Sequence, residues 1–239
     1  MVIDSWQRRI KIEKLNGITV VRKKNKKLRL IRDIILVFSY LLISIVLIHP
    51  SPPPKIGIQS QKNEGFYTRK FLKKNSIITP NLLNISDFEI TEEFVGKENF
   101  YEYASKNDGE ELAYIIGQVT GRLHNVGFVF TDNKSQNYLV DRDNRIVRTD
   151  LVFIQKNRSV YARSIDIGSF LASILNFEYS KYSRLEKSFL VGYKNTINYQ
   201  NSVYLSIILR NILSIGLGDK KMRIIKNMLK KTNFNQILV

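Results

Sequence analysis

The first regular pattern along the chain is an alternation of polar and apolar side chains. It covers residues 9–15 and returns over residues 18–23, on either side of the dipeptide Asn16-Gly17. A period of two residues is typical of β-strands, and Asn-Gly is a favoured two-residue hairpin turn. We therefore predict a β-hairpin near the N-terminus.

Further short strands are predicted over residues 82–85 and 88–94, followed by Gly96. A second hairpin is predicted from residues 138–140 and 146–148, which flank a polar turn.

Helical periodicity dominates the chain after residue 95. Over residues 109–126 apolar side chains recur every three or four positions, which predicts an amphipathic helix. Similar patterns predict helices over residues 165–177, 184–193, 202–215 and 220–231, the last of them strongly basic, and an earlier helix over residues 59–74. Strands first and helices afterwards indicate an α+β fold with two lobes, residues 1–95 and 96–239, and we place the boundary between Glu93 and Gly96.

An apolar segment and a proline-rich linker, residues 28–55, interrupt the first lobe. Residues 34–48 are fifteen positions without a charge, preceded by a basic run over residues 22–27 and followed by four prolines within residues 50–54. This is shorter than the ~20 residues that cross a bilayer. We expect a helix that projects from the first lobe or packs along it, with an apolar face against an anionic membrane surface. A buried packing helix or an oligomer contact is the alternative.

Composition narrows the candidate chemistry. The net charge of +17 favours polyanionic partners such as nucleotides, nucleic acid or anionic lipid. The absence of cysteine excludes disulfides and thiolate metal sites, and two histidines exclude a histidine-rich metal site. The charged first residues lack the pattern of a secretory signal peptide, so we expect a cytoplasmic protein, associated with the inner face of the membrane if the apolar segment binds lipid.

The most informative stretch is Thr131-Asp132-Asn133-Lys134-Ser135-Gln136-Asn137, followed by the second hairpin and then by Asp150. Phosphoryl transfer needs one carboxylate near the attacking hydroxyl, and further oxygen ligands that hold metal against the nucleotide phosphates. A polar loop and a short hairpin can bring such groups together. Asp and Asn oxygens suit Mg²⁺. Polar loops around a hairpin without chemistry are the alternative interpretation.

In this stretch the sequence resembles the protein-kinase superfamily. The resemblance implies that Asp132 is the catalytic Asp, with Lys134 beside it in the catalytic loop. It also implies that Asn137 and Asp150, five and eighteen residues after Asp132, hold the metal.

Other positions are assigned by the same resemblance. Lys23 resembles the phosphate-contacting Lys, with Arg22 and Lys24 as competitors, and Glu64 the Glu that pairs with it across the lobe. The residues around Glu92 and Phe94 resemble the hinge, whose backbone meets adenine.

Asp166 falls where the superfamily has an Asp that braces the catalytic loop, although an ordinary helix N-cap would also explain it. It follows Asp150 by only sixteen residues, and this interval resembles the KEOPS-complex kinase and RIO kinases. Phe189-Leu190-Val191-Gly192-Tyr193 is similar to a late helix of aminoglycoside-phosphotransferase-like kinases.

Two departures bear on activity. No Gly-rich loop precedes Lys23, and Asp150-Leu151-Val152 stands where Asp-Phe-Gly is usual. Neither removes a proton acceptor or a metal ligand.

The resemblance implies an ATP- and Mg²⁺-dependent phosphotransferase, an atypical serine/threonine-protein-kinase-like enzyme that acts on a protein hydroxyl, with a small-molecule or lipid acceptor as the alternative. A pseudokinase scaffold and a basic RNA-binding regulatory protein are the alternatives. Because Lys23 and Asp132 must share one cleft, the apolar segment between them is expected not to cross a membrane.

Overall fold

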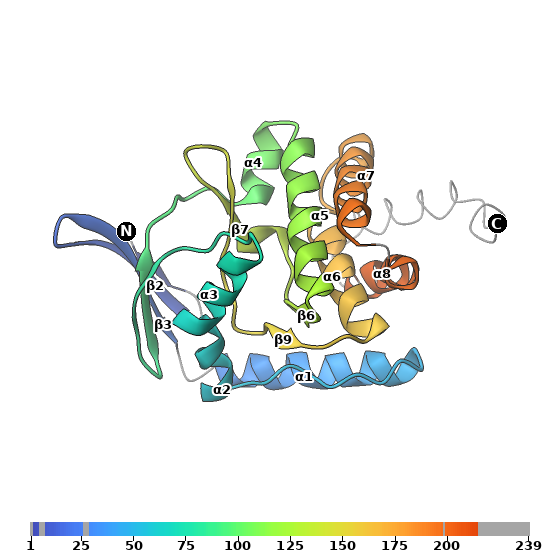
Figure 1. Ribbon diagram of the computed structural model, residues 1–239, viewed down its shortest axis with the longest axis horizontal. Helices are drawn as coiled ribbons and strands as arrows, with labels where there is room; N and C mark the ends of the chain where they lie inside the picture. Colours follow the sequence, from blue (N-terminus) through green and yellow to red (C-terminus); the bar gives the residue numbers. More distant parts are fainter. Residues whose placement is uncertain (1, 5–7, 26–28, 198, 215–239) are drawn as a thin grey trace.

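The computed structural model describes residues 2–4, 8–25, 29–197 and 199–214. Within them the chain forms a small antiparallel sheet followed by a mostly helical lobe, the α+β, two-lobed, kinase-like fold that the sequence predicts (Figure 1). The predicted helix over residues 220–231 lies outside the described residues.

The first lobe is a five-stranded antiparallel sheet with the strand order β1-β2-β3-β5-β4. The predicted hairpin is confirmed as β2 and β3, and its turn residues Asn16 and Gly17 both have positive φ, as a tight hairpin turn requires. The strands are β1 (Val2–Asp4), β2 (Arg8–Leu15), β3 (Ile18–Asn25), β4 (Leu82–Ile85) and β5 (Glu89–Glu93).

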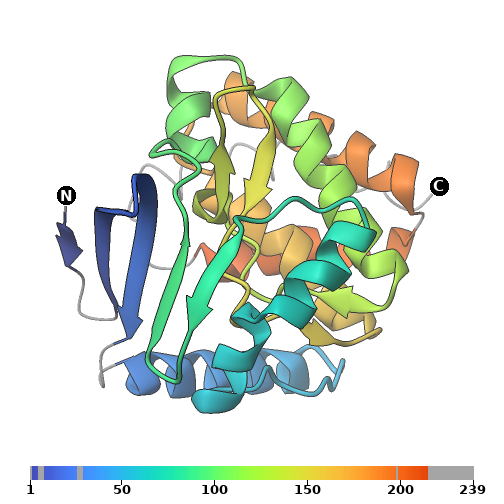
Figure 2. The same ribbon diagram turned by 60° about the vertical axis from the view of Figure 1, so that its left-hand side comes forward.

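A broken helix crosses from the sheet toward the second lobe (Figure 2). The single helix predicted over residues 59–74 is divided into α2 (Ile58–Gln61), the 3₁₀ turn η1 (Lys62–Glu64) and α3 (Phe66–Lys74). Extended backbone at Gly65 ends the 3₁₀ turn and begins α3. Glu64 consequently lies at the break, where its side chain is completely buried.

The second lobe packs α5 against α7 and α6 against α8. The first pair approaches closely, because a Cβ on Gly117 would lie 2.1 Å from the Phe189 carbonyl oxygen and one on Gly192 would lie 2.0 Å from that of Tyr114. The helices are α4 (Phe100–Lys106), α5 (Glu110–Asn125), α6 (Val160–Ser173), α7 (Tyr179–Thr196) and α8 (Gln200–Leu213).

Short strands at the junction of the lobes carry the polar loops. β6 (Phe128–Val129) pairs with β9 (Gln155–Lys156). The predicted second hairpin is confirmed as β7 (Tyr138–Val140) and β8 (Ile146–Arg148), preceded by the 3₁₀ turn η2 (Ser135–Asn137).

The apolar segment forms α1 (Arg29–Val46), which runs along the underside of the molecule in both views (Figures 1 and 2). Its exposed apolar face agrees with the prediction, but its packing does not. α1 contacts the second lobe, where Tyr40 joins Tyr161, Ile165 and Leu209 in a separate apolar cluster. The expectation that α1 packs along the first lobe is therefore wrong. The apolar inner face of α1 packs against α6 and α8 of the second lobe. Among the described residues, no helix combines the length and apolar character that a membrane crossing needs.

Candidate active site

The polar loop between β6 and β7 is held by Asp166, from the middle of α6. Its carboxylate accepts the backbone N–H of Phe130 at 2.6 Å and that of Thr131 at 2.5 Å. Thr131 has φ +65°, an uncommon conformation for a β-branched residue, and these two bonds help to hold it there. α6 begins earlier than predicted and is capped by Ser159, so Asp166 is not an N-cap.

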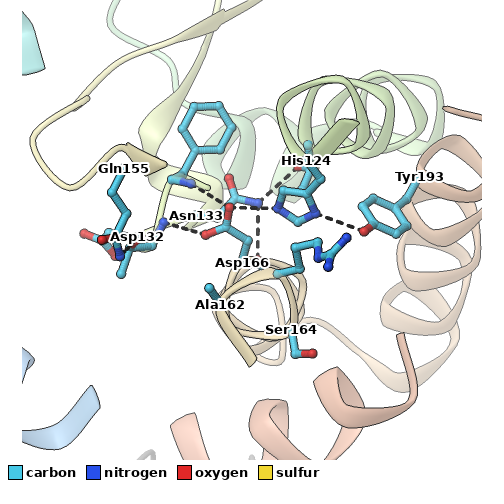
Figure 3. Close-up of polar contacts among 12 residues, drawn as sticks. His124, Asp132, Asn133, Gln155, Ala162, Ser164, Asp166 and Tyr193 are labelled. Atoms are coloured by element: carbon cyan, nitrogen blue, oxygen red, sulfur yellow. Dashed lines mark hydrogen bonds and ion pairs between the residues drawn. The ribbon is translucent and has the colours of Figure 1, made fainter. Parts of the chain in front are cut away.

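A histidine completes the bracing of this carboxylate (Figure 3). His124 Nε2 lies 3.1 Å from Asp166 Oδ2, and its Nδ1 lies 2.9 Å from the Tyr193 hydroxyl. Burial lowers the pKa of His124 more than the neighbouring Asp166 carboxylate raises it, so the ring is neutral at pH 7. Neutral His124 then donates its Nε2–H to Asp166 and accepts the Tyr193 hydroxyl proton at Nδ1.

Asn133 fixes the loop from the other side. Its amide nitrogen donates to Thr120 Oγ1 at 3.1 Å and to the Asp166 carbonyl at 3.2 Å, and its amide oxygen accepts the Tyr138 hydroxyl. Asn133 is fully buried, and it ties the loop to α5, α6 and β7. It was absent from our sequence-based assignments, although it directly follows Asp132.

Asp132, Lys134 and Asn137 come together within this braced loop. Lys134 Nζ lies 2.9 Å from Asp132 Oδ1, and the Asn137 side-chain nitrogen donates to the Asp132 carbonyl at 2.8 Å. The Asp132 side chain is only slightly exposed, whereas Lys134 is mostly exposed. The Asp132 carboxylate is thus placed by a loop whose backbone is fixed from three elements.

Asp150 is brought to the same loop by the second hairpin. Thr149 donates its backbone N–H to the Asn137 carbonyl at 2.9 Å, so the residue before Asp150 lies against the end of η2. Asp150 itself has φ +54°, and it is followed directly by the buried segment Leu151–Ile154. Positive φ is strained for Asp, and such strain is common at functional sites.

A buried arginine connects these two carboxylate-bearing segments. The Arg148 guanidinium donates to the Asp132 carbonyl at 2.9 Å and lies 3.4 Å from the Asp150 carbonyl. It is stacked 4.3 Å from the centre of the Phe130 ring and 4.9 Å from that of Tyr138. Arg148 is the largest fully buried side chain of the described residues. Sequence reasoning missed it, and the short strand β8 gives no alternating pattern that would have indicated its burial, because all three of its residues are buried.

In the first lobe the predicted charged residues form one chain of ion pairs. Lys23 pairs with Glu92, Arg69 lies 2.9 Å from Glu92 and 3.2 Å from Glu64, and Glu64 accepts the Leu151 N–H at 3.1 Å. Burial alone would raise the pKa of Glu92, but Lys23 and Arg69 outweigh it and lower that pKa. The chain thereby links the sheet to the residue that follows Asp150.

This arrangement changes two expectations. Lys23 and Glu64 are connected through Glu92 and Arg69, where the resemblance implies a direct ion pair. Glu92 lies on β5, which pairs with β3 on one side and β4 on the other. Its carboxylate binds Lys23 and Arg69. Glu92 is therefore part of the ion-pair chain and does not occupy an open hinge position. Sequence reasoning missed Arg69.

Phe94, just beyond β5, begins the link between the lobes and donates its backbone N–H to the Thr19 carbonyl. It lines a groove of about 1070 Å³ between α3, the edge of the sheet and the β7–β8 turn. The described residues of that lining do not include Asp132, Asn137 or Asp150. The groove therefore lies beside the predicted catalytic residues. The candidate site is defined by the side-chain contacts of those residues and not by the groove.

The oxygen groups suit a hard cation. Because the Asn137 side-chain nitrogen is engaged by Asp132, its amide oxygen is the group left to act as a ligand. No cluster of three or more His, Cys, Asp or Glu side chains suited to a metal occurs among the described residues. The donor set fits Mg²⁺, which binds through few protein ligands when phosphates and water supply the rest.

Comparison with known proteins gives a partial match to a relative. The chain is similar to a probable bifunctional tRNA threonylcarbamoyladenosine biosynthesis protein of Methanocaldococcus jannaschii, with 27% identity over 88 residues. The match covers 37% of this chain and 16% of that protein, so the chain spans only a small part of its relative. No protein-family model matches.

Proposed function

We propose that this protein is an ATP- and Mg²⁺-dependent phosphotransferase of the atypical kinase type, transferring the γ-phosphoryl group to a hydroxyl. The observation that carries the proposal is the convergence of Asp132, Asn137 and Asp150 on one loop, with Asp166 bracing that loop through two backbone N–H groups. Each of these positions was assigned from the kinase-like pattern alone.

Each side chain at the site is proposed to have a separate role that follows from its position. Asp132 orients the acceptor hydroxyl and receives its proton, and Lys134, 2.9 Å from it, stabilises charge on the transferred group. Lys23 meets the nucleotide phosphates from the first lobe, and Glu92, Arg69 and Glu64 fix its place relative to Leu151. Backbone groups near Phe94 receive adenine.

Asn137 and Asp150 would hold the metal through their side-chain oxygens. Bound Mg²⁺ supplies neutralising charge between the nucleotide phosphates. The protein contributes the fixed positions of the two ligands, which depend on the Thr149 contact with Asn137 and on Arg148.

The acceptor is proposed to be a protein hydroxyl. The relative is named for tRNA modification, and the +17 charge is suited to RNA, so an RNA-bound partner is a second candidate for the acceptor. A pseudokinase scaffold is the competing function, favoured by Asp150-Leu151-Val152 in place of Asp-Phe-Gly.

The test is incubation of the purified chain with γ-labelled ATP and Mg²⁺, comparing Asp132→Asn with Asp150→Asn. Asp150→Asn should strongly weaken metal-dependent ATP binding, because it replaces a negatively charged metal ligand with a neutral amide. Asp132→Asn should retain that binding and lose transfer by about a hundredfold or more, as expected for a general base. Asp143→Asn, on the exposed turn of the same hairpin, is the matched control and should behave as wild type.

Loss of nucleotide binding in Asp132→Asn would mean that the two carboxylates have exchanged roles. A wild-type chain that binds ATP without transfer would support the scaffold instead.

A further inference from the structure

The outer side of α1 is the most apolar exposed surface among the described residues. Its large side chains, about half exposed or more, follow one another at helical spacing. They are Leu30, Ile31, Ile34, Ile35, Phe38, Leu42, Ile45 and Val46, and Ile48 follows directly after the helix. We call these nine residues the outer face. A surface-exposed helix normally turns polar residues to solvent, so a continuous apolar outer face indicates a partner.

The inner side of the same helix is firmly attached to the second lobe. The Tyr40 and Tyr161 rings lie 4.9 Å apart edge to face, and the Tyr161 hydroxyl donates to the Tyr40 carbonyl at 2.9 Å. Ser51, just beyond the helix, lies within 3.0 Å of the side-chain groups of Tyr40, Ser159 and Asn157. The outer face is therefore held in a fixed direction, away from the core.

The charges near α1 indicate the chemistry of the partner. Lys24, Lys26 and Lys27 precede the helix in the sequence, and Arg29 and Arg32 follow in its first turn. Lys23 is paired with Glu92 and Arg22 with Glu13 and Glu89, so neither belongs to this cluster. The helix has one acidic residue, Asp33, and it is buried. An apolar strip that begins at a basic cluster matches a bilayer surface, where anionic headgroups lie over hydrocarbon. A second copy of this chain would bring an equally basic cluster and offers no opposite charge.

We propose that α1 lies in the plane of an anionic lipid bilayer, with its outer face in the interface and the basic residues on the headgroups. The helix, about 27 Å long at 1.5 Å per residue, then holds the molecule on one side of the membrane. This needs no crossing of the bilayer, and it places the tethered second lobe directly above the lipid. It goes beyond the proposed phosphotransfer and does not depend on it.

The experiment is flotation of the full chain with phosphatidylcholine vesicles, with and without phosphatidylserine, at low and high salt. We expect binding to the phosphatidylserine vesicles that weakens with salt. The triple substitution Phe38→Ser, Leu42→Ser and Ile45→Ser should lower the affinity for the vesicles at least about tenfold, because three apolar side chains that would insert into the lipid are replaced by polar ones. The matched control replaces Ile18 and Val191, exposed apolar residues on other elements, with Ser, and should bind as wild type.

Thermal unfolding and ATP binding, measured on the same proteins, should be unchanged by the triple substitution, which separates this result from any failure of the proposed activity. Failure of the wild type to float at low salt overturns the proposal. Equal flotation of wild type and triple variant overturns it as well. So does a dimer, detected by sedimentation, that the triple variant disrupts while vesicles bind neither protein. Binding that disappears on removing residues 215–239 but survives the triple substitution would assign the lipid contact to the C-terminal residues.

Discussion

Arg148 is the residue whose burial is hardest to explain by packing alone. Its Nε and NH1 atoms have no hydrogen-bond partner within the described residues, while its NH2 group holds the Asp132 carbonyl. Burying an incompletely paired guanidinium costs stability, and its shorter hydrogen bond goes to the Asp132 carbonyl, so we infer a positioning role at the candidate site.

We predict that Arg148→Met lowers phosphoryl transfer about tenfold or more, since a hydrogen bond from a charged group contributes about 1.5–3 kcal/mol. Met keeps an apolar contact between Phe130 and Tyr138, so the free energy of unfolding, measured with denaturant, should change little. Turnover at saturating ATP and the ATP dissociation constant would be measured separately. The loss should appear in turnover, because Arg148 orients the loop of Asp132.

Arg145→Met is the control, since Arg145 lies on the exposed turn of the same hairpin. If Arg148→Met transfers the phosphoryl group at the wild-type rate, Arg148 contributes only to packing.

Among the elements, α5, α6 and α7 meet at His124, and this meeting point makes the fold sensitive to acid. The pKa of His124 is lowered in the folded protein, so below about pH 6.5 the unfolded chain binds more protons. Unfolding free energy should consequently fall as pH decreases from about 6.5 toward the folded pKa, by up to about 1.4 kcal/mol per pH unit. Above that range His124 contributes no pH dependence.

His124→Gln keeps a side-chain N–H for Asp166 and removes the titration. Denaturant unfolding at pH 7.0 and 5.5 should show a smaller pH difference in this variant than in wild type. An identical pH difference in both proteins would assign the acid sensitivity to other groups.

The two sides of α1 should respond differently to the same kind of substitution. Tyr40→Ser removes a buried ring from its cluster with Tyr161 and should lower the unfolding free energy by about 3–5 kcal/mol. Phe38→Ser, on the outer face, should change it by no more than about 0.5 kcal/mol. Denaturant unfolding in the absence of lipid measures both, and similar losses would mean that the outer face is covered in solution.

For the whole molecule, a few polar groups attach the segment after Asp150 to the first lobe, beside the apolar contacts between the lobes. The Asn63 side-chain nitrogen donates to the carbonyls of Val152 and Ile154 at 2.7 and 2.9 Å, next to the bond from Leu151 to Glu64. Together these bonds hold the segment after Asp150 against η1.

We predict that Asn63→Ala weakens Mg²⁺-dependent ATP binding severalfold, since about 1 kcal/mol is lost for each bond. Asn75→Ala, which removes one bond to Phe71 within the end of α3, is the control. Isothermal titration of both variants would compare them, and equal affinities would show that the Asn63 contacts do not control the distance between the lobes.

Local patterns in the sequence were sufficient for most of the longer elements and for the closeness of the loop residues, but not for β1, β6, β9 or α4. Both hairpins follow from alternation and turn residues, and the spacing from Asp132 to Asn137 and Asp150 lies within one short loop and one hairpin. The sequence indicated a helix over residues 59–74. It did not indicate the break at Gly65, because helical periodicity continues through that position.

Only the tertiary structure decided which distant groups meet. Arg69 connects Glu64 to Glu92, Arg148 reaches Asp132, and α1 packs on α6 and α8 of the other lobe. These contacts join residues far apart in the chain, and their partners depend on how whole elements pack. A buried Arg or Glu has the same sequence signature as a solvated one, because its charge is neutralised by partners that local sequence does not reveal.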